Sequence, residues 1–497
     1  MELTRKLPLA ISSYVPAAAG AAAFSLYYIS CPPGVGVWDT AEFQTVVWIA
    51  GIPHPTGFPA FLITGWLFTH LLPFGNPAWR LSIMAAFATA LACGVLVASL
   101  RRFGVGHAVA LITGALFAVS EVIWIHATRA AVESLVLLFG SLAVANAIVW
   151  VHERRQRALV SSSLFLGLAI ATHPVALWYI PGFLVLAAAG IRKDAIPWRT
   201  LGHGALAALG ALSLYAYLPI RSAVIVAKKL DPTTSLGLPP GQQLWNAGNP
   251  STLPNFIAFI SGSVYNPASG FHGFYDFSSY PHFFARLEDI VLGQYGAASL
   301  TFAIVGITVL LRSWPLLIGL FLMAFFPIPF SMEYSALADA AKYYLVTLWI
   351  TAWFIGVGTH TLARETPAEL ASIPALILAI FIGVTFQAQS TSRFAQRFDT
   401  NGEAVIETTL LHTEENAIIN GQWSYITPIG YAKYVEGRLG DRIPVPVAEK
   451  NELLAWSHTR PVYWIGPPDM TIQSIPGAVV TLLPNTWPPL YRVAPAH

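Results

Sequence analysis

Long runs of apolar residues recur along most of this chain, and polar residues gather in the stretches between them. Eleven runs approach or exceed the length that a helix needs to cross a bilayer, about 20 residues. Uninterrupted apolar runs of this length predict membrane-spanning helices. The predicted spans are residues 8–30, 81–100, 107–125, 134–151, 158–172, 174–191, 200–219, 290–311, 313–330, 343–361 and 370–388.

The two central runs share one uncharged stretch that is broken at Thr172, His173 and Pro174. Proline lacks the backbone donor of a helix, and its ring disfavours a helical residue before it. Two spans that meet at this break and one kinked span both fit the pattern.

Composition supports the same class of protein. Hydrophobic residues make up 55% of the 497 positions and charged residues only 10%, which is far more apolar than a soluble globular protein. The net charge of +2 is too small to indicate a nucleic-acid partner. Cys31 and Cys93 lack the spacing of a zinc site or a disulfide framework. The chain is therefore predicted to be a polytopic membrane protein.

Basic residues near the span ends predict the orientation. Cytoplasmic loops carry an excess of Lys and Arg, and an alternating arrangement of eleven spans puts every basic cluster on one side. The amino terminus is then cytoplasmic, and the first run is a retained span because it is too long for a signal-peptide core. The clusters are Arg5/Lys6, Arg101/Arg102, Arg154/Arg155/Arg157, Arg192/Lys193/Arg199, Arg312 and Arg364.

The predicted fold class is an all-α polytopic membrane protein with a small C-terminal extracytoplasmic α/β domain. Residues 1–388 form the membrane domain, with extracytoplasmic loops at 31–78 and 221–289. Residues 389–497 form the small domain, since charge density rises there. Its pattern predicts strands at 405–411, 442–447, 461–465 and 479–483 and a helix near 429–439.

The first extracytoplasmic loop contains two acids, Asp39 and Glu42, directly after the first span. On a helix over about 40–51 they lie on one face, because they are three residues apart. Ionisable groups beside a span are candidates for function. A simpler alternative is that Asp39 caps the helix and Glu42 completes a capping box.

A stiff turn follows this predicted helix, His54-Pro55-Thr56-Gly57-Phe58-Pro59. Its prolines and glycine restrict the bend and would hold His54 on the side of the two acids. The alternative is that the turn only redirects the chain along the membrane surface.

Three further residues fall on the same predicted face: Glu133, His173 and Arg221. His173 and Arg221 each have a simple structural explanation, since a lone histidine in an apolar run is usually a core residue and an arginine at a span end often extends to lipid head groups. Glu133 begins the next span and is harder to dismiss. Together with Asp39 and Glu42 they predict a pocket with anionic groups for a nucleophile and cationic groups for a phosphate.

The order of these motifs resembles a multispan family long catalogued as a domain of unknown function. The most specific motifs are Trp38 to Phe43 and His54 to Pro59, and the resemblance covers roughly residues 20–350. The eukaryotic member of that family is an endoplasmic-reticulum protein O-mannosyltransferase that acts on IPT domains of plexins and receptor tyrosine kinases. The resemblance implies the GT-C glycosyltransferase fold and a lipid-linked sugar phosphate as donor.

This chain departs from the usual family pattern in both motifs. The pattern is Asp-Ser/Gly-Gly-Glu followed by His-Pro-Pro-Gly-Tyr-Pro, whereas this chain has Asp39-Thr40-Ala41-Glu42 and His54-Pro55-Thr56-Gly57-Phe58-Pro59, so the glycine and the second proline are lost. Both acids and the histidine are kept. The loss of the glycine and of the second proline changes the freedom of the backbone in both motifs.

Transfer from a polyprenyl-phosphate sugar requires a general base for the acceptor hydroxyl, and Asp39 is the predicted base. Glu42 is expected to hold the acceptor or to tune Asp39, and direct displacement inverts the anomeric carbon. Arg221, with His54 or His173, is predicted to stabilise the leaving phosphate, with Glu133 lining the same pocket. Arg129 and Lys342 are weaker alternatives, and no cofactor or obligatory metal is expected.

The expected partners are a polyprenyl-phosphate sugar, a protein or glycan acceptor and membrane lipids. The competing hypotheses are a lipid or sugar transporter and a non-catalytic scaffold. Against transport, the spans contain almost no ionisable residues and the acids gather at one face. The predicted location is a prokaryotic cell membrane, because the tail is compact and ends without a retention signal.

Overall fold

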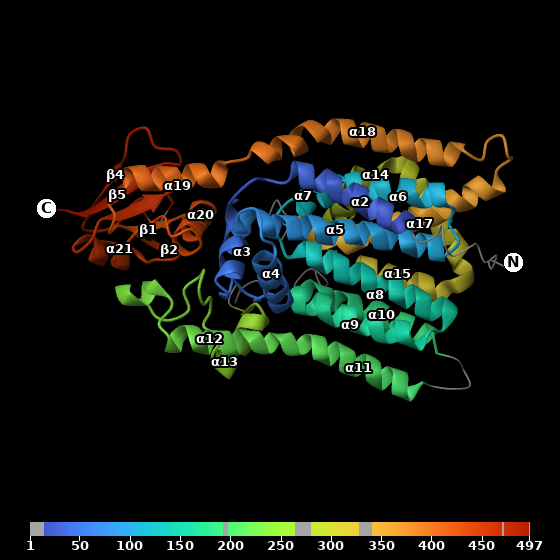
Figure 1. The fold of residues 1–497 in the computed structure, drawn as a ribbon, viewed down its shortest axis with the longest axis horizontal. Coiled ribbons are helices and arrows are strands. Elements are labelled where there is room, and N and C mark those ends of the chain that lie inside the picture. The colour runs from blue at the N-terminus through green and yellow to red at the C-terminus, as the bar shows by residue number, and fades with distance from the viewer. Residues whose placement is uncertain (1–13, 192–196, 264–279, 328–339, 470–471, 497) are drawn as a thin grey trace.

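The computed structural model describes residues 14–191, 197–263, 280–327, 340–469 and 472–496. These residues form an elongated helical bundle with a small α/β unit at one end (Figure 1). The described part of the chain begins in the bundle and ends in the α/β unit. Two short helices of the first loop, α3 (Trp38–Trp48) and α4 (Pro59–Leu71), lie between the bundle and this unit.

Each predicted span coincides, over its described residues, with one helix or with consecutive helices. The helices of the bundle are α2 (Tyr14–Ser30), α5 (Pro77–Arg102), α6 (His107–Val119), α7 (Glu121–Ala127), α8 (Glu133–Glu153), α9 (Gln156–Thr172), α10 (Ile180–Ala189), α11 (Trp198–Leu212), α12 (Tyr217–Ala227), α14 (Tyr280–Leu310), α15 (Trp314–Phe325), α17 (Leu345–Glu365) and α18 (Ile373–Ala395).

Six helical stretches of the described residues are long and apolar enough to cross a membrane. A seventh is possible if α6 and α7, which meet at an angle of 69°, form one bent span. The chain is therefore an integral membrane protein, while the count of eleven spans stays a prediction. The expected break at Thr172–Pro174 is present, because α9 ends at Thr172 and a 3-10 helix, η1 (Pro174–Tyr179), precedes α10.

Helix α5 runs from one end of the bundle to the other, and the two ends differ chemically. At its start, the backbone N–H of Ala78 donates to the hydroxyl of Tyr431 in the α/β unit at 3.1 Å. At its end, Arg102 forms an ion pair with Glu153 of α8. The helix has 26 residues, so the two ends are about 39 Å apart at 1.5 Å per residue.

The α/β unit has a five-stranded sheet in the order β2-β1-β3-β5-β4. Strand β1 pairs in parallel with β2 and β3, whereas β5 pairs antiparallel with β3 and β4. Its elements are α19 (Asn401–His412), β1 (Ile418–Gly421), α20 (Trp423–Tyr434), β2 (Ile443–Val445), α21 (Lys450–Ser457), β3 (Val462–Ile465), β4 (Ala478–Leu482) and β5 (Leu490–Pro495).

The predicted strand at 405–411 is wrong, because these residues lie in α19. Val405, Ile406 and Thr409 are its buried positions, and this spacing is the apolar face of a helix. A short apolar run does not distinguish a strand from a buried helix by its pattern alone. Strand β1 was missed for a related reason, since it has only four residues and ends in Asn420 and Gly421.

The α/β unit shares a hydrophobic core with the first loop. Val35, Ala41 and Ala78 belong to the same buried cluster as residues of α19 and α20. Gly402 lies so close to this loop that a Cβ there would be 2.3 Å from the carbonyl oxygen of Val35. The unit is therefore packed onto the membrane domain.

The predicted loop at 221–289 begins later than expected, since α12 remains helical to Ala227. A 3-10 helix, η3 (Pro232–Leu236), and a short helix, α13 (Leu253–Ile260), follow it. Residues 264–279 of this loop lie outside the described residues.

Candidate active site

Helix α3 carries both acids, and it begins at Trp38, one residue before Asp39. The residue that caps it, Val37, offers no side-chain hydrogen bond. Asp39 is thus inside the first turn, and the interpretation of Asp39 as the helix cap is wrong. Glu42 follows one turn later and is completely buried, whereas Asp39 is partly exposed.

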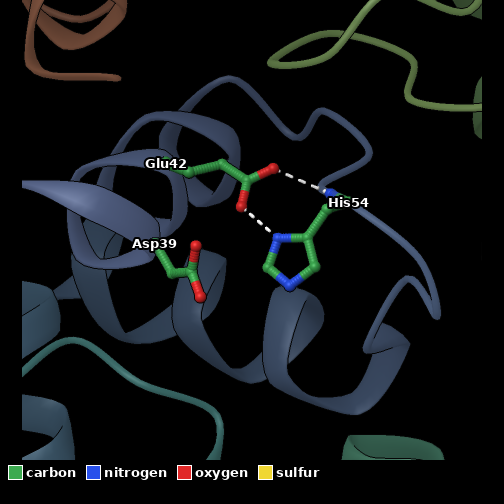
Figure 2. Close-up of side chains that lie close together, drawn as sticks. All are labelled: Asp39, Glu42 and His54. Carbon is green, nitrogen blue, oxygen red and sulfur yellow. Dashed lines mark hydrogen bonds and ion pairs between the residues drawn. The ribbon is translucent and has the colours of Figure 1, made fainter. Parts of the chain in front are cut away.

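Glu42 receives two hydrogen bonds from His54. The backbone N–H of His54 donates to Oε1 at 2.7 Å, and the ring Nδ1 contacts Oε2 (Figure 2). Burial raises the pKa of the Glu42 carboxyl above its ordinary value, although the contacts with His54 oppose this effect. Burial also works against protonation of His54, but the carboxylates of Glu42 and Asp39 outweigh it and raise the pKa of the imidazole. The two side chains therefore form one coupled, proton-sharing pair.

The turn that carries His54 is fixed by packing. Gly57 has φ +93°, and a Cβ there would lie 2.7 Å from Leu218 of α12 and 2.8 Å from Phe259 of α13. Its N–H donates to the carbonyl of His54 at 3.2 Å. Glycine is therefore required both for the backbone conformation and for the close approach, and the turn holds His54 against α3.

Asp39 completes the cluster. One carboxylate oxygen of Asp39, one of Glu42 and one ring nitrogen of His54 all lie within 4.8 Å of one another. Figure 2 shows the Asp39 carboxylate beside the His54 ring, with Glu42 on the neighbouring turn of α3. The predicted grouping of these three residues is therefore present in the structure.

A neutral donor from the α/β unit also reaches Asp39. The indole Nε1 of Trp423 donates to Asp39 Oδ1 at 2.8 Å. No local sequence pattern identifies Trp423 as part of the site, because the two residues are 384 positions apart.

A second group of charged residues lies beside this cluster. Glu133 is nearly buried at the start of α8, and its Oε1 lies 3.9 Å from Nζ of Lys342. The charge of Lys342 also acts on the His54 and His173 rings. Lys342, a weaker candidate by sequence, is therefore paired with Glu133, and its charge acts on both histidines.

His173 belongs to the same region. Its ring stacks on Phe58 with the centroids 5.4 Å apart, and its Nδ1 accepts from the backbone N–H of Val175 at 3.0 Å. Burial, with the charges of Lys342 and His54, lowers the pKa of His173 to about 3. The imidazole is therefore neutral near pH 7, with its proton on Nε2.

Arg221 lies at the other end of α3 from Asp39. Its guanidinium donates to the carbonyls of Ala50 at 2.5 Å and Ile49 at 3.1 Å, and the Tyr217 hydroxyl also donates to Ala50. Cations stabilise the carbonyls at a helix C-terminus. The structure thus gives Arg221 a contact with α3, and it does not bring Arg221 to the carboxylate cluster as the sequence analysis expected.

Asp39, Glu42 and His54 are also the kind of group that can hold a divalent metal. However, Glu42 Oε2 and His54 Nδ1 are in direct contact with each other. A metal ion between these two atoms would require the pair to separate. The expectation of no obligatory metal stays a prediction.

Residues 39–194 match the family model of the N-terminal domain of the protein O-mannosyl-transferase TMEM260. The mouse protein O-mannosyl-transferase TMEM260 is 27% identical over 111 residues, which is 22% of this chain and 16% of the relative. The Dictyostelium discoideum protein of the same name is 27% identical over 120 residues, 22% of this chain and 15% of the relative. The resemblance is confirmed over this segment. Each match spans only about a sixth of the relative's own length.

The fold is similar to that of ArnT from Cupriavidus metallidurans. Its apo structure aligns with 98% of this chain and 100% of its own, with a TM-score of 0.59 and 14% identity. The structure bound to undecaprenyl phosphate gives a TM-score of 0.57 and 13% identity over 97% of this chain and 99% of its own. The expected GT-C-like membrane fold with a small C-terminal sheet is confirmed.

The Glu42–His54 pair predicts a pH-dependent effect of His54→Ala. Without His54, buried Glu42 must bind a proton, and this costs more as the pH rises above the ordinary pKa of glutamate, about 4.3. In the folded wild type the Glu42–His54 pair holds one proton, and in the unfolded wild type His54 holds one below its ordinary pKa of about 6.5. Unfolding of the wild type therefore neither binds nor releases a proton at these two residues between these two pKa values. Destabilisation of the variant relative to the wild type therefore grows by about 1.4 kcal/mol per pH unit between about pH 4.3 and 6.5.

Thermal unfolding in detergent over this pH range measures the effect. His70→Ala is the matched control, because His70 stacks on Trp48 and Trp66 instead of a carboxylate. A difference between His54→Ala and wild type that stays constant with pH would contradict the coupled pair.

Proposed function

We propose that this chain is a membrane glycosyltransferase that moves a mannose-like sugar from a polyprenyl-phosphate donor to a hydroxyl acceptor. The acceptor is proposed to be a protein Ser or Thr side chain. The observation that carries this proposal is the carboxylate of Asp39 beside the buried Glu42–His54 pair, within the segment that matches the protein O-mannosyl-transferase TMEM260 family.

Asp39 is proposed to be the general base. As the acceptor oxygen attacks the anomeric carbon, Asp39 takes the proton of the acceptor hydroxyl. The bond from the anomeric carbon to the phosphate oxygen breaks, and the lipid phosphate leaves with the bonding electrons. The configuration of the sugar is inverted in this single displacement.

Glu42 is assigned a positioning role. It is buried and both of its oxygens accept from His54, so direct contact with the acceptor, one of the two roles expected from the sequence, has no support from its contacts. A buried carboxylate with this partner instead fixes the turn beside Asp39.

Lys342 is proposed to stabilise the leaving phosphate, in place of Arg221. It is paired with Glu133 at 3.9 Å and its charge acts on His54 and His173. Neutral His173 is a suitable hydrogen-bond donor to a phosphate oxygen. Arg221 contacts the carbonyls of Ile49 and Ala50, so its proposed contribution is to hold α3.

The transfer is proposed to take place on the extracytoplasmic face. Support comes from α5, which has the site and the α/β unit near its start and the basic residues Arg101 and Arg102 at its end. By the positive-inside rule the basic end is cytoplasmic. The predicted prokaryotic origin gains no support from the curated relatives, which come from mouse and Dictyostelium discoideum.

Asp39→Asn tests the base. The purified protein is incubated with a panel of polyprenyl-phosphate sugars and hydroxyl acceptor peptides, and release of lipid phosphate is measured. The variant is expected to lower kcat by about 10²- to 10⁴-fold, because an amide cannot take the proton. Asp441→Asn, at an exposed position of the α/β unit, is the control and keeps full activity. Full activity in Asp39→Asn would refute this role, and an inactive wild type with every donor would favour transport or a scaffold.

Lys342→Gln tests the phosphate contact. Loss of one preorganised cation is expected to lower kcat/KM for the donor by about 10²- to 10³-fold, whereas Lys342→Arg keeps part of the activity. Lys228→Gln removes an exposed lysine at the end of α12 and leaves the rate unchanged. Steady-state kinetics with varied donor concentration give these values, and an unaltered kcat/KM in Lys342→Gln would exclude the assignment.

Chelation tests the metal. We expect EDTA treatment followed by gel filtration to leave kcat unchanged, because Glu42 and His54 contact each other directly. Loss of activity that returns only with added Mg²⁺, Mn²⁺ or Zn²⁺ would show instead that the carboxylate cluster binds a metal.

A further inference from the structure

One side chain of the α/β unit enters the proposed active site. Trp423 is the first residue of α20, separated from the end of strand β1 by Gln422, and its indole N–H donates to Asp39 Oδ1 at 2.8 Å. Asp39 lies in the membrane domain, so this hydrogen bond connects the two parts of the chain at the proposed base.

The sheet holds Trp423 in place. The backbone N–H of the preceding residue, Gln422, donates to the carbonyl of Ile465 at 3.1 Å, and its side-chain amide donates to the carbonyl of Pro467, also at 3.1 Å. One turn further along α20, the hydroxyl of Thr427 donates to the Trp423 carbonyl at 3.0 Å. The start of α20 is therefore tied to the sheet and to its own next turn.

Helix α20 is also packed against the first loop. Its residues Ile426 and Ile429 share a buried cluster with Ala41 of α3. The Tyr431 hydroxyl accepts from the backbone N–H of Ala78. The indole therefore approaches Asp39 from a surface that is fixed on both sides.

We propose that Trp423 is a positioning residue for Asp39, and that the α/β unit is for this reason part of the active site. This inference rests on the proposed function, in which Asp39 is the base. An indole N–H is a donor only, so it orients the carboxylate without competing for the acceptor's proton. It occupies Oδ1 and leaves Oδ2 to meet the acceptor hydroxyl.

The other groups near Asp39 have different chemistry. Glu42 on α3 and His54 in the turn are titratable and share a proton with each other, and the charge of Lys342 acts on His54. Trp423 carries no charge. Its removal therefore changes the orientation and hydrogen bonding of Asp39 without changing the net charge of the site.

Trp423→Phe tests the inference, with Trp456→Phe as the matched control. The indole of Trp456 also links the α/β unit to the membrane domain, since it donates to the carbonyl of Leu236 at 3.1 Å, but it does not contact Asp39. We expect Trp423→Phe to lower kcat about 10- to 100-fold, as for the loss of one hydrogen bond to a charged group, with KM for the donor unchanged. Trp456→Phe keeps kcat near that of the wild type.

The split between kcat and KM, together with a conservative variant, distinguishes positioning from partial unfolding. Loss of the indole N–H removes a donor that orients the proposed base, so kcat of the folded enzyme falls while KM for the donor stays unchanged. A partly unfolded variant lowers kcat only in proportion to its folded fraction, which gel filtration and circular dichroism measure. Trp423→His, which keeps a ring N–H, is expected to recover part of the rate.

Two results would overturn the inference while leaving the proposed function intact. One is an unchanged kcat in Trp423→Phe when Asp39→Asn is inactive, and the other is an equal loss of kcat in Trp423→Phe and Trp456→Phe with no recovery in Trp423→His. Full activity of Asp39→Asn would instead overturn the proposed function itself.

Discussion

The burial of the Glu42 carboxylate is the constraint on which the rest of the site depends. A carboxylate without solvent contact is unfavourable unless it is paired or protonated, and in this chain both of its oxygens accept from His54. His54 can supply the backbone N–H and the ring nitrogen together only because the turn folds back onto α3. The turn requires glycine at position 57, because the backbone there has φ +93° and lies too close to α12 and α13 for a side chain. The buried acid, the histidine and the glycine are therefore parts of one arrangement, and Asp39 is placed beside it as the more exposed acid.

Helix α3 is held at both ends by segments that are distant in sequence. At its start the α/β unit packs on Ala41 and donates to Asp39 through Trp423. At its end Arg221 and Tyr217 of α12 donate to the carbonyl of Ala50. An eleven-residue helix has little stability of its own, so these tertiary contacts determine its position. This arrangement explains why a short loop helix can hold the carboxylate of the proposed base in a defined orientation.

The sequence was sufficient where the physics is local. Apolar runs located the helices, and the break at His173 followed from Pro174, because both depend on residues that are neighbours in the chain. The grouping of Asp39, Glu42 and His54 was also predictable from spacing and turn chemistry. The prediction was wrong or incomplete where the outcome depends on tertiary contacts. Residues 405–411 form a helix because one face packs in the core shared with the first loop, and neither Trp423 nor the carbonyl contacts of Arg221 have a local pattern that reveals them.

The distribution of charge explains why a cation on the side of Lys342 suits the proposed reaction. Proton transfer to Asp39 removes one negative charge from the acceptor side of the site, while the leaving lipid phosphate gains one on the donor side. The total charge stays constant, and the reaction moves negative charge from one side to the other. A fixed positive group on the donor side favours this movement, because its attraction strengthens as the charge arrives. Lys342, held by Glu133 and close enough to act on neutral His173, meets this requirement. Arg221 contacts the far end of α3, where it stabilises the helix but lies away from the charge that moves.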